Sequence, residues 1–131
     1  MIVNDPDVLE EVTAAFARYE AALVANDVAV LDALFWNDAR TVRYGPAESL
    51  YGRDEILSFR KARPPAGLDR ILRRTVITTF GTDFATANTE FTRPGTDRIG
   101  RQSQTWARTA EGWRVVAAHV SLRDRLPEDA P

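Results

Sequence analysis

Several side chains in this sequence have the chemistry to bind a small anion and to move a proton. Arg43, Arg60 and Arg63 carry planar guanidinium groups, which bind a carboxylate through two parallel hydrogen bonds. The hydroxyl of Tyr19 can donate or accept a proton, and the amide of Gln104 can donate to and accept from a carbonyl-containing ligand. Because only one of the 17 basic residues is a lysine, an anion site in this protein must be built from arginine.

A predicted β-hairpin over Gly100–Leu122 brings a histidine and a serine into apolar surroundings. Its two strand-like segments flank a turn at Thr109–Gly112. Alternation with a period of two places the following residues on one face of the second strand: Trp113, Val115, Ala117, His119 and Ser121. His119, the only histidine, and Ser121 then suit the floor of a pocket. A core histidine that is hydrogen-bonded to a neighbour fits the pattern equally well.

The first strand of this hairpin has two faces of different character. Gln104 shares one face with Trp106, and Ser103 shares the other with Arg101. A glutamine that points into a pocket offers a neutral donor and acceptor for a carbonyl or an amide.

Each of the arginine and tyrosine candidates also has a purely structural interpretation. Tyr19 lies in the apolar stripe of a helix, where its hydroxyl can bond a backbone carbonyl instead of a ligand. Arg43 lies in a short strand, where arginine is often a solvated edge residue. Arg60 and Arg63 share a helical side with Ile56 and Phe59, past which arginines commonly extend to water. The residues alone leave both interpretations open.

Helices are predicted in the first half of the chain. Asp5-Pro6 starts the first helix, which carries an apolar stripe at spacings of three or four: Val8, Val12, Phe16, Tyr19 and Leu23. Asn26-Asp27 ends this helix and caps a short second helix that runs through Phe35. A third helix opens at Gly52-Arg53-Asp54, and Pro64-Pro65 stops it.

Strands dominate the rest of the chain. Thr41–Tyr44 is a short strand with Thr41 and Arg43 on one face, and Leu50-Tyr51 is expected to pair nearby. Four longer strand-like segments follow: Leu68–Phe80, Phe84–Thr92, Ile99–Arg108 and Trp113–Leu122. Helices followed by a meander predict an α+β fold with the helices packed on one face of a curved antiparallel sheet. We expect one domain over residues 1–131, with an ordered core of about 3–125 and a frayed polar tail at 126–131.

Composition excludes several classes of function. A net charge of −2 gives no reason to expect nucleic acid or an anionic membrane as a partner. With no cysteine and one histidine, thiolate chemistry and a zinc or iron site built from protein ligands alone are not expected, and we predict no cofactor. Phosphate-binding loops and serine-nucleophile motifs are missing from the sequence. The acidic N-terminus lacks the pattern of a signal peptide, so a cytoplasmic protein is expected.

Several segments together resemble a known family. They are Leu34-Phe35-Trp36, Val42-Arg43-Tyr44-Gly45, Phe59-Arg60-x-x-Arg63, Gly100-Arg101-Gln102-Ser103-Gln104-Thr105-Trp106 and Ala117-Ala118-His119-Val120-Ser121. The chain resembles the AtzH/HpxZ-like branch of the nuclear transport factor 2-like superfamily, which also contains SnoaL-like cyclases and ketosteroid isomerase. The resemblance spans roughly Val3 to Arg125 and implies a cone-shaped, cystatin-like fold in which a strongly bent sheet wraps the first helix.

The resemblance also implies an activity. The AtzH/HpxZ-like branch is associated with nitrogen catabolism, through oxalurate or ureas derived from cyanuric acid, and accompanies amidase-signature enzymes. It implies hydrolysis of a carboxylated urea such as 1,3-dicarboxyurea to allophanate, with Tyr19 and Arg43 as the catalytic pair. Such substrates are small, planar and anionic, which suits arginine in a mostly apolar pocket. The predicted substrate-binding residues are Trp36, Arg60, Arg63, Ser103, Gln104, His119 and Ser121.

Two other functions stay open at this point. The protein could be a non-catalytic module that binds a small acid or assists an amidase. It could also be an isomerase or lyase of the ketosteroid isomerase type, which needs a carboxylate base that only Glu90 or Asp38 could supply.

A homodimer is expected because the sheet face turned away from the first helix must be covered. The apolar residues predicted on that face are Val116, Ala118, Val120, Leu72, Val76 and Phe84 or Phe91.

Overall fold

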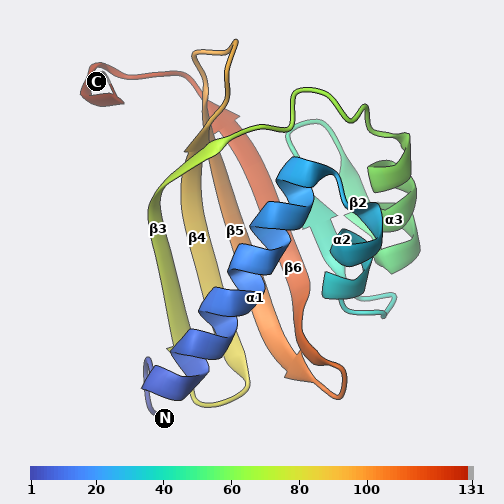
Figure 1. Cartoon of the computed structure of the whole chain (residues 1–131), viewed down its shortest axis with the longest axis vertical. Coiled ribbons are helices and arrows are strands. Elements are labelled where there is room, and N and C mark those ends of the chain that lie inside the picture. The colour runs from blue at the N-terminus through green and yellow to red at the C-terminus, as the bar shows by residue number, and fades with distance from the viewer. Residues whose placement is uncertain (130–131) are drawn as a thin grey trace.

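The first helix, α1 (Pro6–Ala25), begins and ends where the sequence predicts (Figure 1). In the computed structural model, which describes residues 1–129, the side chain of Asp5 accepts hydrogen bonds from the backbone N–H groups of Asp7 and Val8 at 3.0 and 3.3 Å. These bonds satisfy two donors that the helix leaves free at its N-terminus. Asn26 ends the helix in a left-handed conformation. The predicted stripe is buried and contacts the sheet.

Two shorter helices and a small hairpin follow α1: the first of these helices packs against α1, and the second packs against the first and against the hairpin. Helix α2 (Val28–Leu34) is capped by Asp27, and α3 (Arg53–Ala62) ends before the two prolines. The hairpin consists of β1 (Val42–Tyr44) and β2 (Ser49–Tyr51). No helix within residues 1–129 is long and apolar enough to cross a membrane.

The remaining strands form the predicted meander: β3 (Ile71–Phe80), β4 (Phe84–Thr92), β5 (Ile99–Thr109) and β6 (Gly112–Arg123). The first of them starts at Ile71 rather than at Leu68. The sheet of six strands has the order β2-β1-β6-β5-β4-β3. Because β1 pairs with β6 in parallel, the sheet is mixed, and the expectation of an entirely antiparallel sheet is wrong at this pair. Parallel neighbours need a long connection, which α3 and the rest of the meander supply here.

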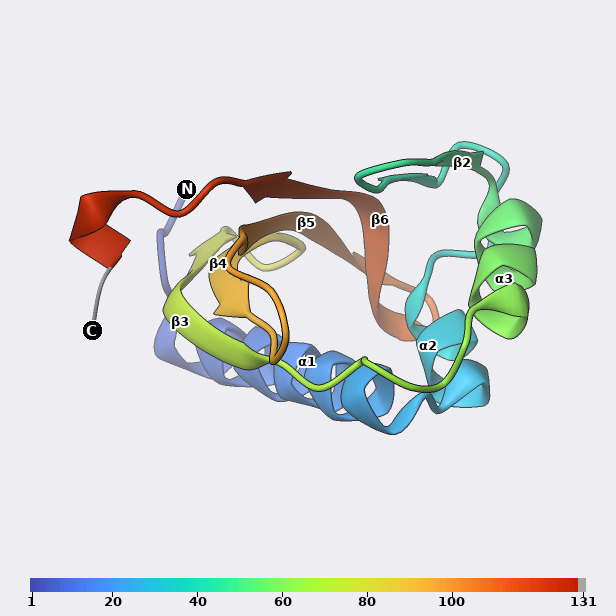
Figure 2. The same cartoon turned by 90° about the horizontal axis from the view of Figure 1, so that it is seen from above.

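The sheet curls around α1, as the view from above shows (Figure 2). We call the face toward α1 the inner face and the opposite one the outer face. The inner face carries Ala85, Ala87, Trp106 and Val115, which are almost fully buried against the helix stripe. The α+β fold that the sequence pattern predicts is confirmed, and so is the bent sheet around the first helix that the family resemblance implies.

An irregularity in β6 overturns one predicted face. Trp106 pairs with Val115, but Thr105 pairs with Ala117, so Val116 has no partner and forms a β-bulge. The strand therefore reverses its faces at this point. Trp113 and Val115 point inward, whereas His119 and Ser121 point outward, and the prediction that all four share one face is wrong.

The same bulge corrects the predicted outer face. It turns Ala118 and Val120 inward, and Ala118 is buried. Phe91 is buried and Leu72 packs against the core, so these two residues also leave the outer face. Val76 and Phe84 are exposed, as a surface available for association requires.

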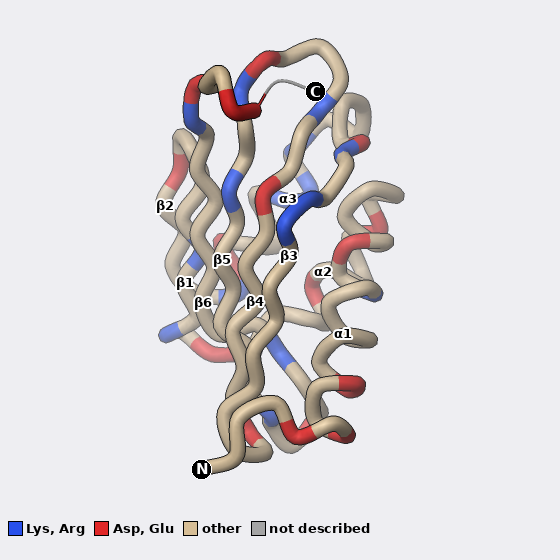
Figure 3. Tube along the Cα trace, turned by 90° about the vertical axis from the view of Figure 1, so that its left-hand side faces the viewer, with Lys and Arg blue, Asp and Glu red and all other residues tan. Residues whose placement is uncertain are grey.

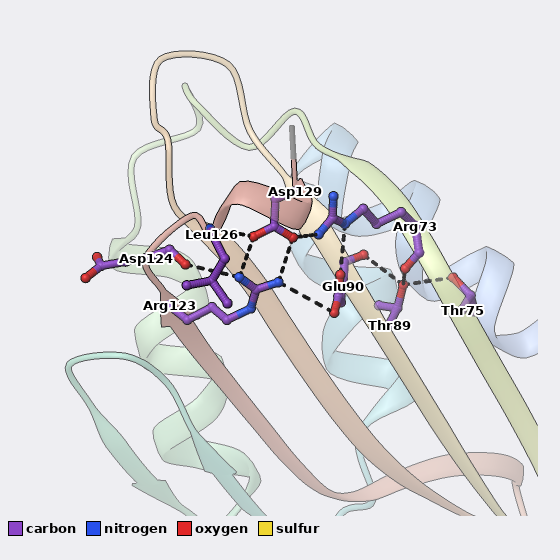
Figure 4. A network of polar contacts seen from close by, with 8 residues as sticks. All are labelled: Arg73, Thr75, Thr89, Glu90, Arg123, Asp124, Leu126 and Asp129. Carbon is purple, nitrogen blue, oxygen red and sulfur yellow. Dashed lines mark hydrogen bonds and ion pairs between the residues drawn. The ribbon is translucent and has the colours of Figure 1, made fainter. Parts of the chain in front are cut away.

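The C-terminal segment is held in place rather than frayed. A short 3₁₀ helix, η1 (Pro127–Asp129), brings Asp129 against β3 and β6, where its carboxylate accepts hydrogen bonds from Arg73 and Arg123 (Figure 4). The backbone N–H of Leu126 also donates to this carboxylate, at 2.8 Å. The prediction of a frayed tail was based on its polarity, which does not reveal that Asp129 forms hydrogen bonds with distant strands. The last two residues of the predicted tail, 130 and 131, lie outside the described part of the chain.

Candidate functional site

Four arginines meet at the end of the inner face where α1, α3 and β1 come together. We call Arg43, Arg60, Arg63 and Arg70 the inner arginine cluster. Arg43 comes from β1, Arg60 from the last turn of α3, Arg63 from the residue after that helix, and Arg70 from just before β3. Only 2% of Arg60 and 6% of Arg43 is exposed. Charged residues are rarely buried so completely, which makes this cluster unusual.

Local sequence explains why these side chains face inward. Arg60 follows the buried Ile56 by four positions, so both lie on one side of α3, and Arg63 comes one further turn along at the residue that ends the helix. Pro64 forces Arg63 into an extended conformation, which ends the helix at this residue. Thr41, which directly precedes β1, and Arg43 are both buried and face inward, so the face that they were predicted to share is confirmed and the interpretation of Arg43 as a solvated edge residue is wrong.

Tyr19 projects from α1 into the inner arginine cluster. Its ring meets those of Phe35 and Trp106 edge-on, with centroid separations of 6.0 and 6.3 Å. Its hydroxyl oxygen accepts a hydrogen bond from Nη2 of Arg60 at 2.7 Å. The partner of this buried tyrosine is thus an arginine, whereas the structural interpretation of the sequence required a backbone carbonyl.

The charges of the cluster change the acidity of its members. Burial by itself raises the pKa of Tyr19, but the positive charges of Arg60, Arg43, Arg70 and Arg63 outweigh it, so the pKa is lowered overall. Burial and the repulsion of neighbouring arginines lower the pKa of Arg63 to about 10. The same two causes lower the pKa of Arg60. The cluster therefore carries more positive charge than its surroundings balance.

Carboxylates balance only part of this charge. Nη1 of Arg43 donates to Glu48 at 2.8 Å, and its guanidinium lies over the ring of Phe59 at 5.1 Å. Arg70 donates to Glu20 through both Nε and Nη2. Among residues 1–129, the hydroxyl of Tyr19 is the only hydrogen-bond partner of the Arg60 side chain.

Several buried donors around Tyr19 have no hydrogen-bond partner among the described residues. They belong to Arg43 (Nε), Arg60 (Nε and Nη1), Arg63 (Nε and Nη2), Gln102 (Nε2) and Gln104 (Nε2). Native proteins hydrogen-bond nearly all of their buried polar atoms, and this group of donors can bind a ligand that is rich in acceptors. Planar guanidinium groups favour a carboxylate in particular.

The two glutamines are held by neighbours that leave their donors free. Trp106 donates its indole N–H to the carbonyl oxygen of Gln104 at 3.0 Å, and Arg70 donates to the carbonyl oxygen of Gln102 at 3.1 Å. Each amide nitrogen is consequently available to an acceptor on a ligand.

The structure brings together four of the predicted site residues with Tyr19: Arg43, Arg60, Arg63 and Gln104. It does not bring Trp36 to them. The backbone N–H of Trp36 donates to Val115 at 3.0 Å, and the side chain lies under the exposed Arg40, whose guanidinium is 5.1 Å from the ring.

His119, Ser103 and Ser121 lie on the outer face, because of the bulge at Val116. His119 meets the ring of Tyr44 edge-on at 5.7 Å and is paired across the strands with Ser103. The hydroxyl of Ser121 accepts a hydrogen bond from Arg101 at 3.2 Å. These residues surround a different part of the surface from that of Tyr19.

Sequence reasoning did not find Arg70, Glu20, Glu48 or Gln102. One signal was present, because Gln102 precedes Gln104 by two positions and must share its face. Arg70 and Glu48 lie in loops or next to them, where no periodicity indicates a direction. Their roles depend on contacts with distant segments.

A groove of about 620 Å³ lies on the outer face, lined by residues of β3, β4 and β5 that include Arg74, Asn88, Glu90 and Arg101. We assign the candidate site to the inner arginine cluster instead, because unmatched buried donors identify a ligand site more specifically than open volume does. Within residues 1–129, no three histidine, cysteine, aspartate or glutamate side chains are grouped so that they could hold a metal ion.

Comparison with known proteins places the chain among proteins of the same fold. The family model described as AtzH-like matches residues 1–125. A crystal structure of a protein of unknown function from the DUF3225 family, from Pectobacterium atrosepticum, is 67% identical, with a TM-score of 0.92 over 93% of this chain and 95% of that one. A cystatin-like fold protein from Burkholderia xenovorans is 53% identical, with a TM-score of 0.92 over 96% and 99%.

More distant structures share the fold alone. A nuclear transport factor 2-like superfamily protein from Salmonella enterica is 24% identical, with a TM-score of 0.73 over 91% of this chain and 93% of that one. No curated protein is similar enough to the chain to count as a relative.

Proposed function

The chain belongs to the AtzH-like family, and from this membership and the inner arginine cluster we propose that it hydrolyses a small carboxylated urea in nitrogen catabolism. The substrate we propose is 1,3-dicarboxyurea or a close relative, and the product is allophanate. Tyr19 and Arg43 form the catalytic pair. Arg60, Arg63 and Gln104 bind the substrate beside them.

The observation that carries this proposal is the excess of buried, unmatched donors around Tyr19. A dicarboxylated urea has two terminal carboxylates and a central carbonyl, all of them acceptors in one plane. Guanidinium groups match the carboxylates, and the free amide of Gln104 matches the carbonyl. Binding of a dianion would also relieve the repulsion that lowers the pKa of Arg60 and Arg63.

The proposed reaction requires few catalytic groups. Conversion of 1,3-dicarboxyurea to allophanate removes one terminal carboxyl group: a proton goes to nitrogen, the bond from nitrogen to the carboxyl carbon breaks, and carbon dioxide leaves. Water supplies the proton overall and carries the carbon away as bicarbonate. A residue that binds the carboxylate and one that moves the proton suffice, and no covalent nucleophile is required.

The isomerase alternative finds no support in the site. Glu90 lies on the outer face, where it pairs with Arg73 and Arg123. Asp38 pairs with the exposed Arg40, whose hydrogen bonds lower the pKa of Asp38 to about 2. Neither carboxylate is part of the inner arginine cluster, so neither is placed to act there as a base.

The test is turnover of 1,3-dicarboxyurea by the purified chain without a partner, followed as allophanate and carbon dioxide. The substrate is labile, so a Tyr19→Phe/Arg43→Gln double variant measures the uncatalysed rate under the same conditions. We expect a rate well above that background. If wild type and double variant release allophanate equally while the wild type gains thermal stability with the substrate, the protein is a binding or accessory module.

We also propose that the protein is a homodimer formed through the outer face. Val76 and Phe84 are both 57% exposed there, and apolar side chains so placed on a small domain favour association. Analytical ultracentrifugation at micromolar concentration should show a dimer, and Phe84→Glu should shift it toward monomer. A wild type that sediments as a monomer contradicts this proposal.

A further inference from the structure

Tyr19 receives a hydrogen bond from Arg60, and its own proton has no acceptor among the described residues. In the contact of 2.7 Å, the guanidinium donates and the phenol oxygen accepts. A neutral phenol also has a proton to donate, whereas a phenolate only accepts. The hydrogen-bonding geometry around the oxygen is therefore suited to the phenolate.

The acceptors of the cluster are already engaged by other donors. The carboxylate of Glu20 accepts from Arg70, and that of Glu48 accepts from Arg43. The side-chain carbonyl oxygens of Gln102 and Gln104 accept from Arg70 and Trp106. The buried side-chain atoms near Tyr19 that have no partner at all among the described residues are N–H donors, which stabilise a negative oxygen and not a hydroxyl proton.

The charges that face Tyr19 act in the same direction. Arg43 faces it from β1, Arg60 and Arg63 from α3 and its end, and Arg70 from the segment before β3. The carboxylate adjacent in α1, Glu20, is paired with Arg70. The remaining walls, Phe35 and Trp106, are uncharged rings. Burial opposes ionisation of Tyr19, but the arginines prevail and its pKa is lowered.

We propose that Arg60 is a positioning residue that fixes the hydroxyl of Tyr19 and stabilises its phenolate, so that Tyr19 is the proton donor of the site. The catalytic part of this inference rests on the proposed function. It also gives Arg60 a role that Arg43 lacks: Nη2 of Arg60 acts through Tyr19, whereas its unmatched Nε and Nη1 remain available to the substrate.

Proton transfer from Tyr19 and loss of carbon dioxide require no reactant other than the substrate and water. The O–H bond of Tyr19 breaks as an N–H bond forms on the urea nitrogen. The bond between this nitrogen and the carboxyl carbon then breaks with its electron pair on nitrogen, and carbon dioxide leaves. A water molecule returns a proton to the phenolate, and the resulting hydroxide combines with carbon dioxide as bicarbonate. A donor with a pKa closer to neutrality transfers its proton more readily, which is the contribution of Arg60.

The small number of tyrosines makes this inference measurable. The chain has three, and the other two, Tyr44 and Tyr51, form an exposed pair with their hydroxyls 3.2 Å apart. A Tyr44→Phe/Tyr51→Phe background leaves Tyr19 as the only phenol. Its ionisation can then be followed by the near-ultraviolet absorbance of phenolate against pH, with or without substrate.

In this background we expect Tyr19 to ionise below the range of a free phenol. Arg60→Met should raise its pKa by at least about one unit, a tenfold decrease in acid dissociation, and Arg60→Lys should restore part of the shift. The matched control is Arg53→Met, which removes another arginine from α3. Because Arg53 donates to Asp32 at 2.9 and 2.8 Å and faces away from the cluster, it should leave the ionisation of Tyr19 unchanged.

The pH–rate profile tests the direction of proton transfer. A proton donor is inactive once it has ionised, so the alkaline limb of the profile should follow the pKa of Tyr19 and move upward in Arg60→Met. If Tyr19 has the pKa of a free phenol, or if Arg60→Met leaves this pKa unchanged, then Arg60 does not stabilise the phenolate and the proposal is wrong. If Arg60→Met shifts the pKa of Tyr19 but the alkaline limb of the pH–rate profile does not move, then Tyr19 is not the proton donor.

Failure of the proposed function gives a different result. If no carboxylated urea is turned over, the activity proposed for the protein is wrong, and the role of donor is lost with it. The absorbance titration still decides whether Arg60 stabilises the phenolate of Tyr19, because it needs no substrate.

Discussion

Two groups of arginines in this small domain are arranged in opposite ways. On the outer face, Arg73 and Arg123 share the carboxylates of Glu90 and Asp129 in a network that ties η1 to β3 and β6 (Figure 4). On the inner face, Arg60 has only the hydroxyl of Tyr19 as a partner among the described residues, and two of its nitrogens are unmatched.

The distribution of charge along the chain does not reveal this difference. Basic segments mark the upper part of β3 as well as the surroundings of α3, and acidic residues are spread along α1 (Figure 3). What separates the two groups is the supply of carboxylates within reach. A satisfied network stabilises the fold, whereas a buried group of cations that lacks acceptors destabilises it, which is why we propose a ligand site at the inner arginine cluster and not at the outer network.

The largest expected effect comes from Tyr19→Phe, which removes the proton but keeps the ring against Phe35 and Trp106. We expect kcat to fall by about 10²–10⁴-fold, the usual contribution of general acid–base catalysis. Loss of the hydrogen bond from the charged Arg60 should lower the free energy of unfolding by about 1.5–3 kcal/mol. Paired rate and melting measurements check both values.

The matched control for this variant is Tyr51→Phe, which removes an exposed hydroxyl of the outer face. It should leave turnover unchanged. If Tyr19→Phe keeps full turnover and only its melting temperature falls, Tyr19 is a packing residue. The difference between the inner arginine cluster and the outer network then has no consequence for catalysis.

A smaller effect is expected for Arg43→Lys, which keeps the charge but loses the planar pair of donors. The loss of a charge-assisted hydrogen bond, worth about 1.5–3 kcal/mol, predicts a decrease in kcat/KM of about 10–150-fold. Steady-state kinetics with the carboxylated urea measure it. Arg40→Lys changes an exposed arginine that also pairs with a carboxylate, and its kinetics should match those of wild type. Equal kinetics for both variants would reduce Arg43 to a structural charge.

The smallest effect on activity is expected in the outer network. Hydrogen bonds from Arg123, Leu126 and Arg73 lower the pKa of Asp129 well below its usual range. A carboxyl group with a lowered pKa stabilises the folded state above its unfolded pKa of about 3.9 and loses that effect as the pH falls toward its folded pKa. Asp129→Asn should therefore lower the melting temperature at pH 7, and the difference from wild type should narrow below about pH 4.

Turnover by Asp129→Asn should stay within about twofold of wild type, because the network does not touch the inner arginine cluster. Asp124→Asn is its control, since this residue is 95% exposed and lies 3.8 Å from Arg98. A loss of turnover in Asp129→Asn at unchanged stability would show that the outer network is coupled to the site.

Much of the fold could be predicted because its signals are local. The Asp5 cap, the stripe of α1 and the prolines after α3 act over a few residues, and the structure confirms the elements that they predict. The inward orientation of Arg43 and Gln104 follows from alternation in regular strands. The prediction for His119 was wrong because alternation holds only while a strand is regular, and the bulge at Val116 depends on pairing between two strands.

The sequence by itself determined which segments are helices and strands, and it identified Tyr19, Arg43, Arg60, Arg63 and Gln104 as candidates. Only the tertiary structure decided which arginines are balanced. Tyr19 and Arg60 are 41 positions apart, Arg70 reaches Glu20 across 50, and Arg73 reaches Asp129 across 56. The environment of a charge depends on all the groups that folding brings within a few ångströms, and no local pattern in a chain specifies that set.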